Sequence, residues 1–337
     1  MPLRSVLDAA RRGERITREE AGYILSMEGA PAELLEAAGT ARDRHLGREL
    51  RFYYPLPRFP NASVTGSRCA LRCRHCGGRY LEGMTSVETP SKLRRFCADL
   101  EARGAIGLLV SGGSDARGRV PLGPFLDALR WAKENTGLIV NVHTGLLDAA
   151  EAEEIASAGV DIASVDVVGS DETIRRVYGL DATAGDYRET LEALRGAGVP
   201  SVVPHICVGL DHGEIRGEAA ALGMVQGFDP DLVVILGLIP TPGTPMEAVD
   251  PPSAEDMARA VAAARLMCPR AGVALGCMRA RNDKARTEEL VIAAGADRIV
   301  LPARATIEKA AKQGFDVKHL DGCCSIPRSL EHRSLRR

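Results

Sequence analysis

A short segment of the sequence carries three cysteines with the spacing Cys-x3-Cys-x2-Cys. In SVTGSRCALRCRHCGGRY they are Cys69, Cys73 and Cys76. Three thiolates from one loop can hold three irons of a [4Fe-4S] cubane, which leaves the fourth iron open to a substrate or cofactor. The alternative is a zinc site whose fourth ligand is His75 or a distant residue. In either case the spacing predicts a metal centre on this loop.

Three further cysteines could form a second centre. Cys277 directly follows a predicted strand, and Cys323 and Cys324 are adjacent in a tail that could fold back over the same mouth of the fold. Together they could anchor an auxiliary iron-sulfur cluster, or they could be incidental thiols. A disulfide between adjacent residues would be strained. The other cysteines occupy helix or strand positions typical of small buried hydrophobes; these are Cys97, Cys207 and Cys268.

The bulk composition narrows the class of protein. The 337 residues are 45% hydrophobic, enough for a sizeable core, and 43 basic and 45 acidic residues give a net charge of -2. These charges are interspersed, so we expect neither nucleic acid nor a membrane surface as partner. No apolar stretch reaches the roughly 18 to 20 residues of a membrane span, and the start of the chain lacks a signal-peptide core. We therefore expect a cytoplasmic protein.

Short apolar runs alternate with amphipathic helical stretches from about residue 61 onward, which indicates parallel βαβ units. The helical stretches include SKLRRFCADLEARG, PFLDALRWAKENTG and YRETLEALRGAG. The predicted strands are 61–66, 106–112, 138–143, 161–167, 201–208, 232–237, 272–276 and 298–302.

Eight such units predict an α/β fold of the TIM-type (βα)8 barrel, with a doubly wound open sheet as the competing arrangement. We divide the chain into an N-terminal helical extension (1–58), the barrel (59–303) and a cysteine-containing C-terminal segment (304–337). The end of that segment, RSLEHRSLRR, is expected to be disordered.

The cysteine triplet directly after the first strand resembles the signature of the radical S-adenosylmethionine (SAM) superfamily. The resemblance implies that SAM chelates the open iron and is cleaved to a 5'-deoxyadenosyl radical. It also implies that the SAM amino group is received by Ser111, Gly112 and Gly113, in LLVSGGSD at the end of strand two.

The same resemblance assigns the remaining SAM contacts. His75 stands where the family often has an aromatic residue beside the adenine, although it could be a simple turn residue. Asp166, at the end of strand four, resembles the polar residue that binds the ribose hydroxyls, since a carboxylate facing the barrel interior is otherwise costly. Val208 and Gly209 would lie along the adenine, although a strand-to-helix turn explains the glycine equally well.

The stretch from about 60 to 303 looks like biotin synthase and its relatives, through AGVDIASVDVV, YRETLEALRGAGV, VGLDHGE and LIPTPGTPME. Biotin synthase itself fits poorly. To within a residue, the positions of the three cysteines that bind its sacrificial [2Fe-2S] cluster hold Val110, Asn141 and Val203, and only the arginine ligand has a match, in Arg279. Without thiolates that cluster cannot bind.

SVTG before the triplet, NVHTG, VPHICVGL, LGCMR and the terminal CCSIP resemble a group of biotin-synthase-like proteins in archaea and some bacteria. The best match within it is a subunit of the two-protein lipoyl synthase. This implies sulfur insertion into a protein-bound octanoyl chain, with auxiliary-cluster sulfide capturing the carbon radical. The implied partners are an octanoylated lipoyl-domain protein, a second radical SAM protein and an electron donor such as ferredoxin or flavodoxin.

Two histidines at strand ends, His143 and His205, could line the substrate channel, as could Arg279, or they could be hydrogen-bonded core or rim groups. Two other functions remain open. One is a radical SAM carbon-carbon rearrangement or methylation in cofactor biosynthesis, which needs no sacrificial sulfur. The other is a non-catalytic metal-binding barrel that scaffolds a partner enzyme.

Overall fold

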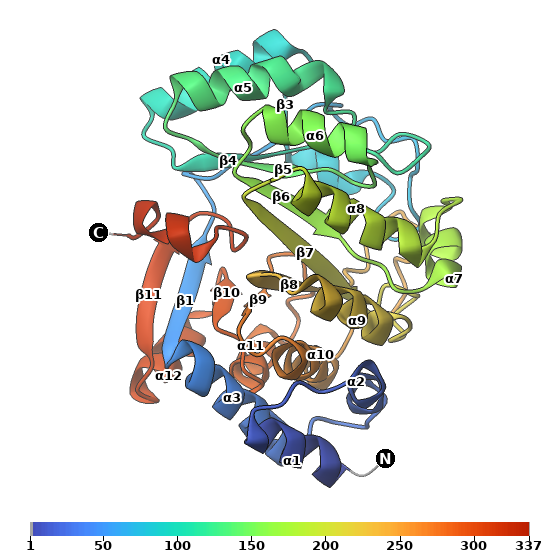
Figure 1. Cartoon of the computed structure of the whole chain (residues 1–337), viewed down its shortest axis with the longest axis vertical. Helices are drawn as coiled ribbons and strands as arrows, with labels where there is room; N and C mark the ends of the chain where they lie inside the picture. The colour runs from blue at the N-terminus through green and yellow to red at the C-terminus, as the bar shows by residue number, and fades with distance from the viewer. Residues whose placement is uncertain (1–2, 337) are drawn as a thin grey trace.

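The computed structural model describes residues 3–336. It begins with three helices, α1 (Leu3–Arg12), α2 (Arg18–Leu25) and α3 (Ala32–Leu46), as the sequence predicts. Helix α2 starts at a capping box, in which the Thr17 hydroxyl and the Glu20 carboxylate each accept from the other residue's backbone N–H. In Figure 1 these helices lie at the dark-blue end of the molecule, next to α10 (Ala254–Met267).

All eight predicted strands form, and they are parallel neighbours in sequence order. This sequential order confirms the TIM-type arrangement, because a doubly wound sheet reverses its strand order. The strands are β2 (Asn61–Ser63), β4 (Gly107–Ser111), β5 (Ile139–His143), β6 (Ile162–Asp166), β7 (Ser201–Val208), β8 (Leu232–Gly237), β9 (Gly272–Leu275) and β10 (Arg298–Val300).

Three strands are not predicted by the sequence pattern. β1 (Glu49–Tyr54) and β11 (Asp316–Asp321) extend the sheet beyond β10, and the short β3 (Thr85–Ser86) lies beside β2. β1 interrupts its apolar run with Arg51, which is nevertheless buried. Both end regions of the chain therefore contribute strands to the barrel sheet. Among residues 3–336, no ladder joins β11 to β3, so the sheet is open at this seam.

Helices cover the outer face of the sheet (Figure 1). Helix α10 is almost entirely buried, because α2, α3 and α11 (Lys284–Ala293) pack around it. No helix among the described residues is long and apolar enough to cross a membrane. The other helices of this layer are α4 (Pro90–Ala102), α5 (Leu126–Asn135), α6 (Ala149–Ser157), α7 (Asp171–Thr173), α8 (Ala184–Gly196), α9 (Glu218–Phe228), α11 (Lys284–Ala293) and α12 (Arg304–Lys312).

The C-terminal tail enters the barrel. Its Cys324 and Ile326 belong to the same apolar cluster as Ile139, Ile162 and Val234, which fill the barrel interior. Ile326 is fully buried. The tail thus supplies part of the inner core, beside the open seam of the sheet.

Two expectations about the tail are wrong. Residues Arg328–Arg333 form a short 3-10 helix that is tied to the barrel, where disorder was expected, because the Glu331 carboxylate pairs with buried arginines. The cysteine pair also does not fold over the barrel mouth, meaning the carboxyl ends of the strands. It is held from the barrel floor, the amino ends, since Arg298 is the first residue of β10 and donates to the Cys324 carbonyl.

Candidate active site

The loop after β2 holds Cys69, Cys73 and Cys76 in one turn. The backbone N–H groups of Cys76 and Gly77 both donate to the Cys73 carbonyl, at 3.2 and 2.8 Å. Cys73 is buried, while Cys69 and Cys76 are half-buried. The three thiols therefore project from a compact, hydrogen-bonded turn at the mouth of the barrel.

The electrostatics of this turn favour a thiolate. A hydrogen bond from the Cys73 thiol, aided by His75, lowers the pKa of Cys76 to about 4. The same hydrogen bond, with burial, raises the pKa of Cys73. The thiolate is the form that binds metal, so the donor set suits iron. A single zinc ion needs ligand atoms within about 4 Å of one another. Within residues 3–336, no three His, Cys, Asp or Glu side chains lie that close together, a finding that applies to iron and to zinc alike.

The predicted SAM motif lies directly against the cysteine loop. Ser111 ends β4, and Gly112 and Gly113 follow it. A Cβ atom added at Gly113 would lie 2.0 Å from the Arg68 carbonyl oxygen and 2.6 Å from the Cys69 Cα, which no side chain can tolerate. The Gly113 N–H donates to the Thr65 hydroxyl at 2.7 Å. This position requires glycine because the cysteine loop and the strand end touch there.

His75 lies among aromatic side chains. Its ring meets that of Tyr178 edge-on at a centroid distance of 5.5 Å, and Tyr80 lies at 6.2 Å. The Tyr80 hydroxyl pairs with that of Thr241 at 3.2 Å. The two tyrosines were missed by the sequence analysis, because isolated aromatic residues carry no spacing signal. The group offers flat surfaces beside the cysteine loop, which suits an adenine ring.

The remaining predicted SAM contacts lie at neighbouring strand ends. Asp166 ends β6 with an exposed side chain, and its backbone is in register with His205 of β7. Val208 is buried at the end of β7 and Gly209 follows with φ +74°. The sequence analysis missed Glu218, whose carboxylate accepts from the Gly209 N–H at 2.8 Å. Burial raises the pKa of Glu218 to about 7.

A polar layer crosses the middle of the barrel. The rings of His143 and His205 meet edge-on at 5.5 Å. His205 Nδ1 lies 3.0 Å from the Val203 carbonyl, which can only accept, so Nδ1 carries the proton and Nε2 has a free lone pair. Nε2 lies 3.4 Å from the Ser325 hydroxyl. Burial, then His143, lowers the pKa of His205 to about 4, so the ring is neutral near pH 7.

Cys277 lies near enough to the tail pair Cys323 and Cys324 for their charges to interact, and we call the three cysteines the auxiliary thiols. A hydrogen bond from the Cys324 thiol lowers the pKa of Cys323 to about 6, and the same bond raises that of Cys324. Cys277 keeps exposed surface, although many protein atoms lie around its sulfur. This partial burial, and then the charge of Cys323, raises the pKa of Cys277. The Asn141 amide lies beside the Cys323 sulfur, but its Nδ2 has no hydrogen-bond partner among the described residues. Cys323 thus lies next to Ser325 and the polar layer.

The positions compared with biotin synthase differ in their placement. Val203 and Asn141 face the barrel interior, but Val110 packs outward, and its neighbour Leu109 packs inward. Arg279 is buried, and its guanidinium donates to the Glu288 carboxylate at 2.7 Å and the Val300 carbonyl at 3.0 Å. These contacts hold its Nη atoms at the barrel wall, and its role in a substrate channel stays a prediction.

Comparison with protein families agrees with this geometry. Residues 63–216 match the Radical SAM superfamily, and residues 235–320 match the Biotin and Thiamin Synthesis associated domain. The first match contains the cysteine loop and the predicted SAM contacts. The second contains Cys277 and all but the last residue of β11, and it ends at residue 320, before Cys323.

Individual relatives point the same way. Biotin synthase of Halorhodospira halophila is 28% identical over 257 residues, which are 72% of this chain and 74% of that protein. Biotin synthase of Acidithiobacillus ferrooxidans is 33% identical over 189 residues, but these are only 53% of this chain and 56% of that protein. The second alignment therefore spans little more than half of its relative's length.

Solved structures share the fold. Methylornithine synthase superposes with a TM-score of 0.64 at 20% identity, over 88% of this chain and 85% of that one. The FeFe-hydrogenase maturase HydG from Carboxydothermus hydrogenoformans gives 0.66 at 15% identity, over 98% and 80%. With the cysteine loop, the glycine motif and both matched domains, these findings show that the chain belongs to the radical SAM superfamily, in its biotin synthase-like branch.

Proposed function

We propose that this radical SAM enzyme inserts sulfur into a protein-bound octanoyl chain, as one subunit of a two-protein lipoyl synthase. The observation that supports this most is that the tail cysteines Cys323 and Cys324 lie inside the barrel, with Cys277 near them. Biotin synthase places its sacrificial cluster there on barrel-strand cysteines, which this chain lacks. Here the C-terminal tail and Cys277 bring thiols to the interior by a different route.

In this proposal Cys69, Cys73 and Cys76 hold a [4Fe-4S] cluster. With bound SAM and one electron from a ferredoxin or flavodoxin, this cluster supplies a 5'-deoxyadenosyl radical that removes a hydrogen atom from a substrate carbon. The chain binds the cofactor: Gly112 and Gly113 receive the SAM amino group, and Asp166 receives the ribose hydroxyls. We propose the cytoplasm as the location, because a low-potential donor of this kind works in a reducing compartment.

The auxiliary thiols would hold the sulfur donor. The lowered pKa of Cys323 favours the thiolate that binds iron. His205 is neutral and directs a lone pair toward Ser325, beside the tail cysteines, so it can accept a hydrogen bond without adding charge to the interior. His143 lies beside it and would line the path of the acyl chain.

The test uses anaerobically reconstituted full-length chain with an octanoylated lipoyl-domain protein, SAM and a reductant, alone and with a candidate partner synthase. We expect the lipoyl-domain protein to gain mass consistent with sulfur, and we expect no gain with the Cys323→Ala variant. Iron and sulfide counts distinguish sulfur insertion from the main alternative, a carbon-carbon rearrangement. Sulfur insertion predicts two clusters, whereas a rearrangement needs only one. Absence of any sulfur-dependent mass gain, with active SAM cleavage, would contradict the proposal.

A further inference from the structure

A network of buried polar groups joins the C-terminal tail to the barrel floor. We call Arg51, Tyr53, Arg298 and Glu331 the floor network. Arg298, only 1% exposed, donates to the Ile326 carbonyl at 2.7 Å and to the Cys324 carbonyl at 3.3 Å. Its guanidinium also pairs with the Glu331 carboxylate at 2.9 Å. One arginine thus holds both carbonyls that flank Ser325 and the helix that follows.

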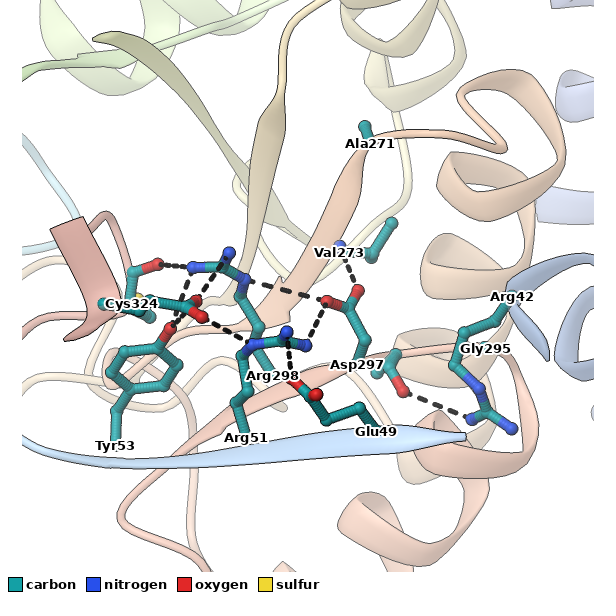
Figure 2. A network of polar contacts seen from close by, with 12 residues as sticks. Arg42, Glu49, Arg51, Tyr53, Ala271, Val273, Gly295, Asp297, Arg298 and Cys324 are labelled. Atoms are coloured by element: carbon teal, nitrogen blue, oxygen red, sulfur yellow. Dashed lines mark hydrogen bonds and ion pairs between the residues drawn. The ribbon is translucent and has the colours of Figure 1, made fainter. Parts of the chain in front are cut away.

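The other two members fix the same carboxylate. Arg51 Nε donates to Glu331 at 2.8 Å, and the Tyr53 hydroxyl donates to it at 2.6 Å. Arg298 in turn donates to the Tyr53 oxygen at 2.9 Å. Figure 2 shows Arg298 between the Cys324 loop on one side and Asp297 on the other. Because Arg51 and Tyr53 lie on β1 and Arg298 lies on β10, two neighbouring strands bind the tail through the Glu331 carboxylate.

Asp297 connects this network to the helix layer. Its carboxylate accepts from Arg265 at 2.7 Å and from the Val273 backbone N–H at 2.7 Å. Arg265 and Asp297 are both fully buried. The tail is therefore tied, through β10, to α10.

General stability is a poor explanation for this arrangement. Burying ion pairs costs desolvation, and apolar replacements are often as stable or more so. Three atoms of the arrangement have no hydrogen-bond partner at all, Arg51 Nη1, Asp297 Oδ2 and Arg298 Nε. What these contacts do fix is geometry: they set the height and direction of the Cys323–Ser325 turn inside the barrel.

We propose that Arg298 and Glu331 are positioning residues that present Cys323 and Cys324 to Cys277. This inference rests on the proposed function for its purpose, since the auxiliary thiols need a fixed geometry only if they bind a cluster together. Whether or not a cluster binds, the floor network keeps the tail cysteines inside the barrel. Arg298 and Glu331 would therefore set the positions of the auxiliary thiols although neither residue is itself a ligand of the cluster.

The experiment compares Arg298→Met and Glu331→Gln with matched surface variants, Arg304→Met and Glu308→Gln, whose side chains form an exposed pair on α12. Each full-length protein is reconstituted without oxygen, and iron and sulfide are counted. We expect the floor variants to lose most iron beyond the roughly four atoms of the SAM-site cluster. Their formation of 5'-deoxyadenosine from SAM should stay within about twofold of the parent, which shows that the barrel is folded.

A second readout does not depend on the cluster. In metal-free protein, alkylation of Cys323 and Cys324 is followed by peptide mass spectrometry, and we expect it to be about tenfold faster in both floor variants than in the surface variants. Unchanged alkylation and unchanged iron would overturn the inference. If the parent chain binds no second cluster but alkylation still accelerates, the positioning role is supported while the proposed function fails.

Discussion

The pKa of Cys76 is set by another cysteine of the same loop, Cys73. The hydrogen bond from Cys73 lowers the pKa of Cys76 and so favours its thiolate, in a turn closed by the Cys73 carbonyl. Cys97, by contrast, is a buried thiol on α4 whose pKa burial raises to about 12. The opposite pKa shifts of Cys76 and Cys97 distinguish the proposed metal ligand from a cysteine that only packs in the core.

We predict that Cys76→Ala abolishes the SAM-site cluster and lowers 5'-deoxyadenosine formation by about a hundredfold or more. The Cys97→Ala variant serves as the control and should retain the cluster and the activity, at some loss of stability. The measurement is product formation from SAM under strong reductant, together with the cubane absorption band. Equal losses in the two variants would show that the triplet has no special role.

Glu218 gives a prediction about pH. Its pKa is about 7 in the folded chain against an ordinary value of 4.5, so between these values the folded state keeps a proton that the unfolded state has lost. The stabilisation that comes from keeping Glu218 protonated is therefore fully present below pH 4.5 and is lost as the pH rises through 7. One carboxylate oxygen, Oε2, has no hydrogen-bond partner, in keeping with a protonated group.

Glu218→Gln should remove this dependence. We expect the variant to be more stable than the parent by about 2 kcal/mol at pH 8, and to match it at pH 4.5. Denaturant unfolding of the metal-free, reduced proteins at the two pH values measures this. The exposed Glu308→Gln variant should show the parent's pH dependence, and the same dependence in Glu218→Gln would contradict the assignment.

At the scale of elements, the end of β4 and the cysteine loop act as one unit. The missing side chain at Gly113 is what lets them touch. Gly113→Ala should therefore displace the loop and reduce SAM-site iron by at least about tenfold. Gly123→Ala is the matched control, because a Cβ atom there meets nothing within 4 Å. Iron content of the reconstituted proteins decides the point, and full cluster occupancy in Gly113→Ala would refute it.

The eight barrel strands could be predicted from sequence because each is a short apolar run between helical stretches. β1 could not, because Arg51 is buried there by partners that are far apart in sequence, Glu331 and Asp297. The same limit applies to the tail. RSLEHRSLRR looks like a solvated, disordered end until Arg51 and Arg298 are known to lie around Glu331. Local patterns cannot show a charge that is paired across the fold.

The candidate site follows the same division. The metal-binding character of the triplet could be predicted from its spacing, and the resemblance to the radical SAM superfamily pointed to the glycine motif and Asp166. The structure places these two at strand ends, and their contacts with SAM stay predictions. Tyr178 and Glu218 could not, since nothing in their spacing shows that they lie beside His75 and Gly209. The sequence allowed the tail cysteines to lie near Cys277 but did not show it, and their approach from the barrel floor depends on Arg298, which no local pattern indicates.

At the scale of the whole molecule, the tail is both a core element and a carrier of thiols. Ile326 is fully buried in the barrel interior. We predict that Ile326→Ala lowers the free energy of unfolding by about 3 kcal/mol, through loss of burial and the cavity left behind. Chemical denaturation measures this, with the exposed Leu335→Ala as control. A loss below about 1 kcal/mol would mean that the tail is only loosely inserted.

The most direct test of the account follows the sulfur atom itself. The chain is reconstituted with isotopically heavy sulfide, separated from free sulfide and incubated with SAM, reductant, the octanoylated lipoyl-domain protein and the partner synthase. We predict heavy sulfur in the product from the parent chain, and none from Cys277→Ala, Cys323→Ala or Cys324→Ala. Unlabelled product from the parent, or labelled product from all three variants, would contradict the claim that these thiols hold the sulfur source.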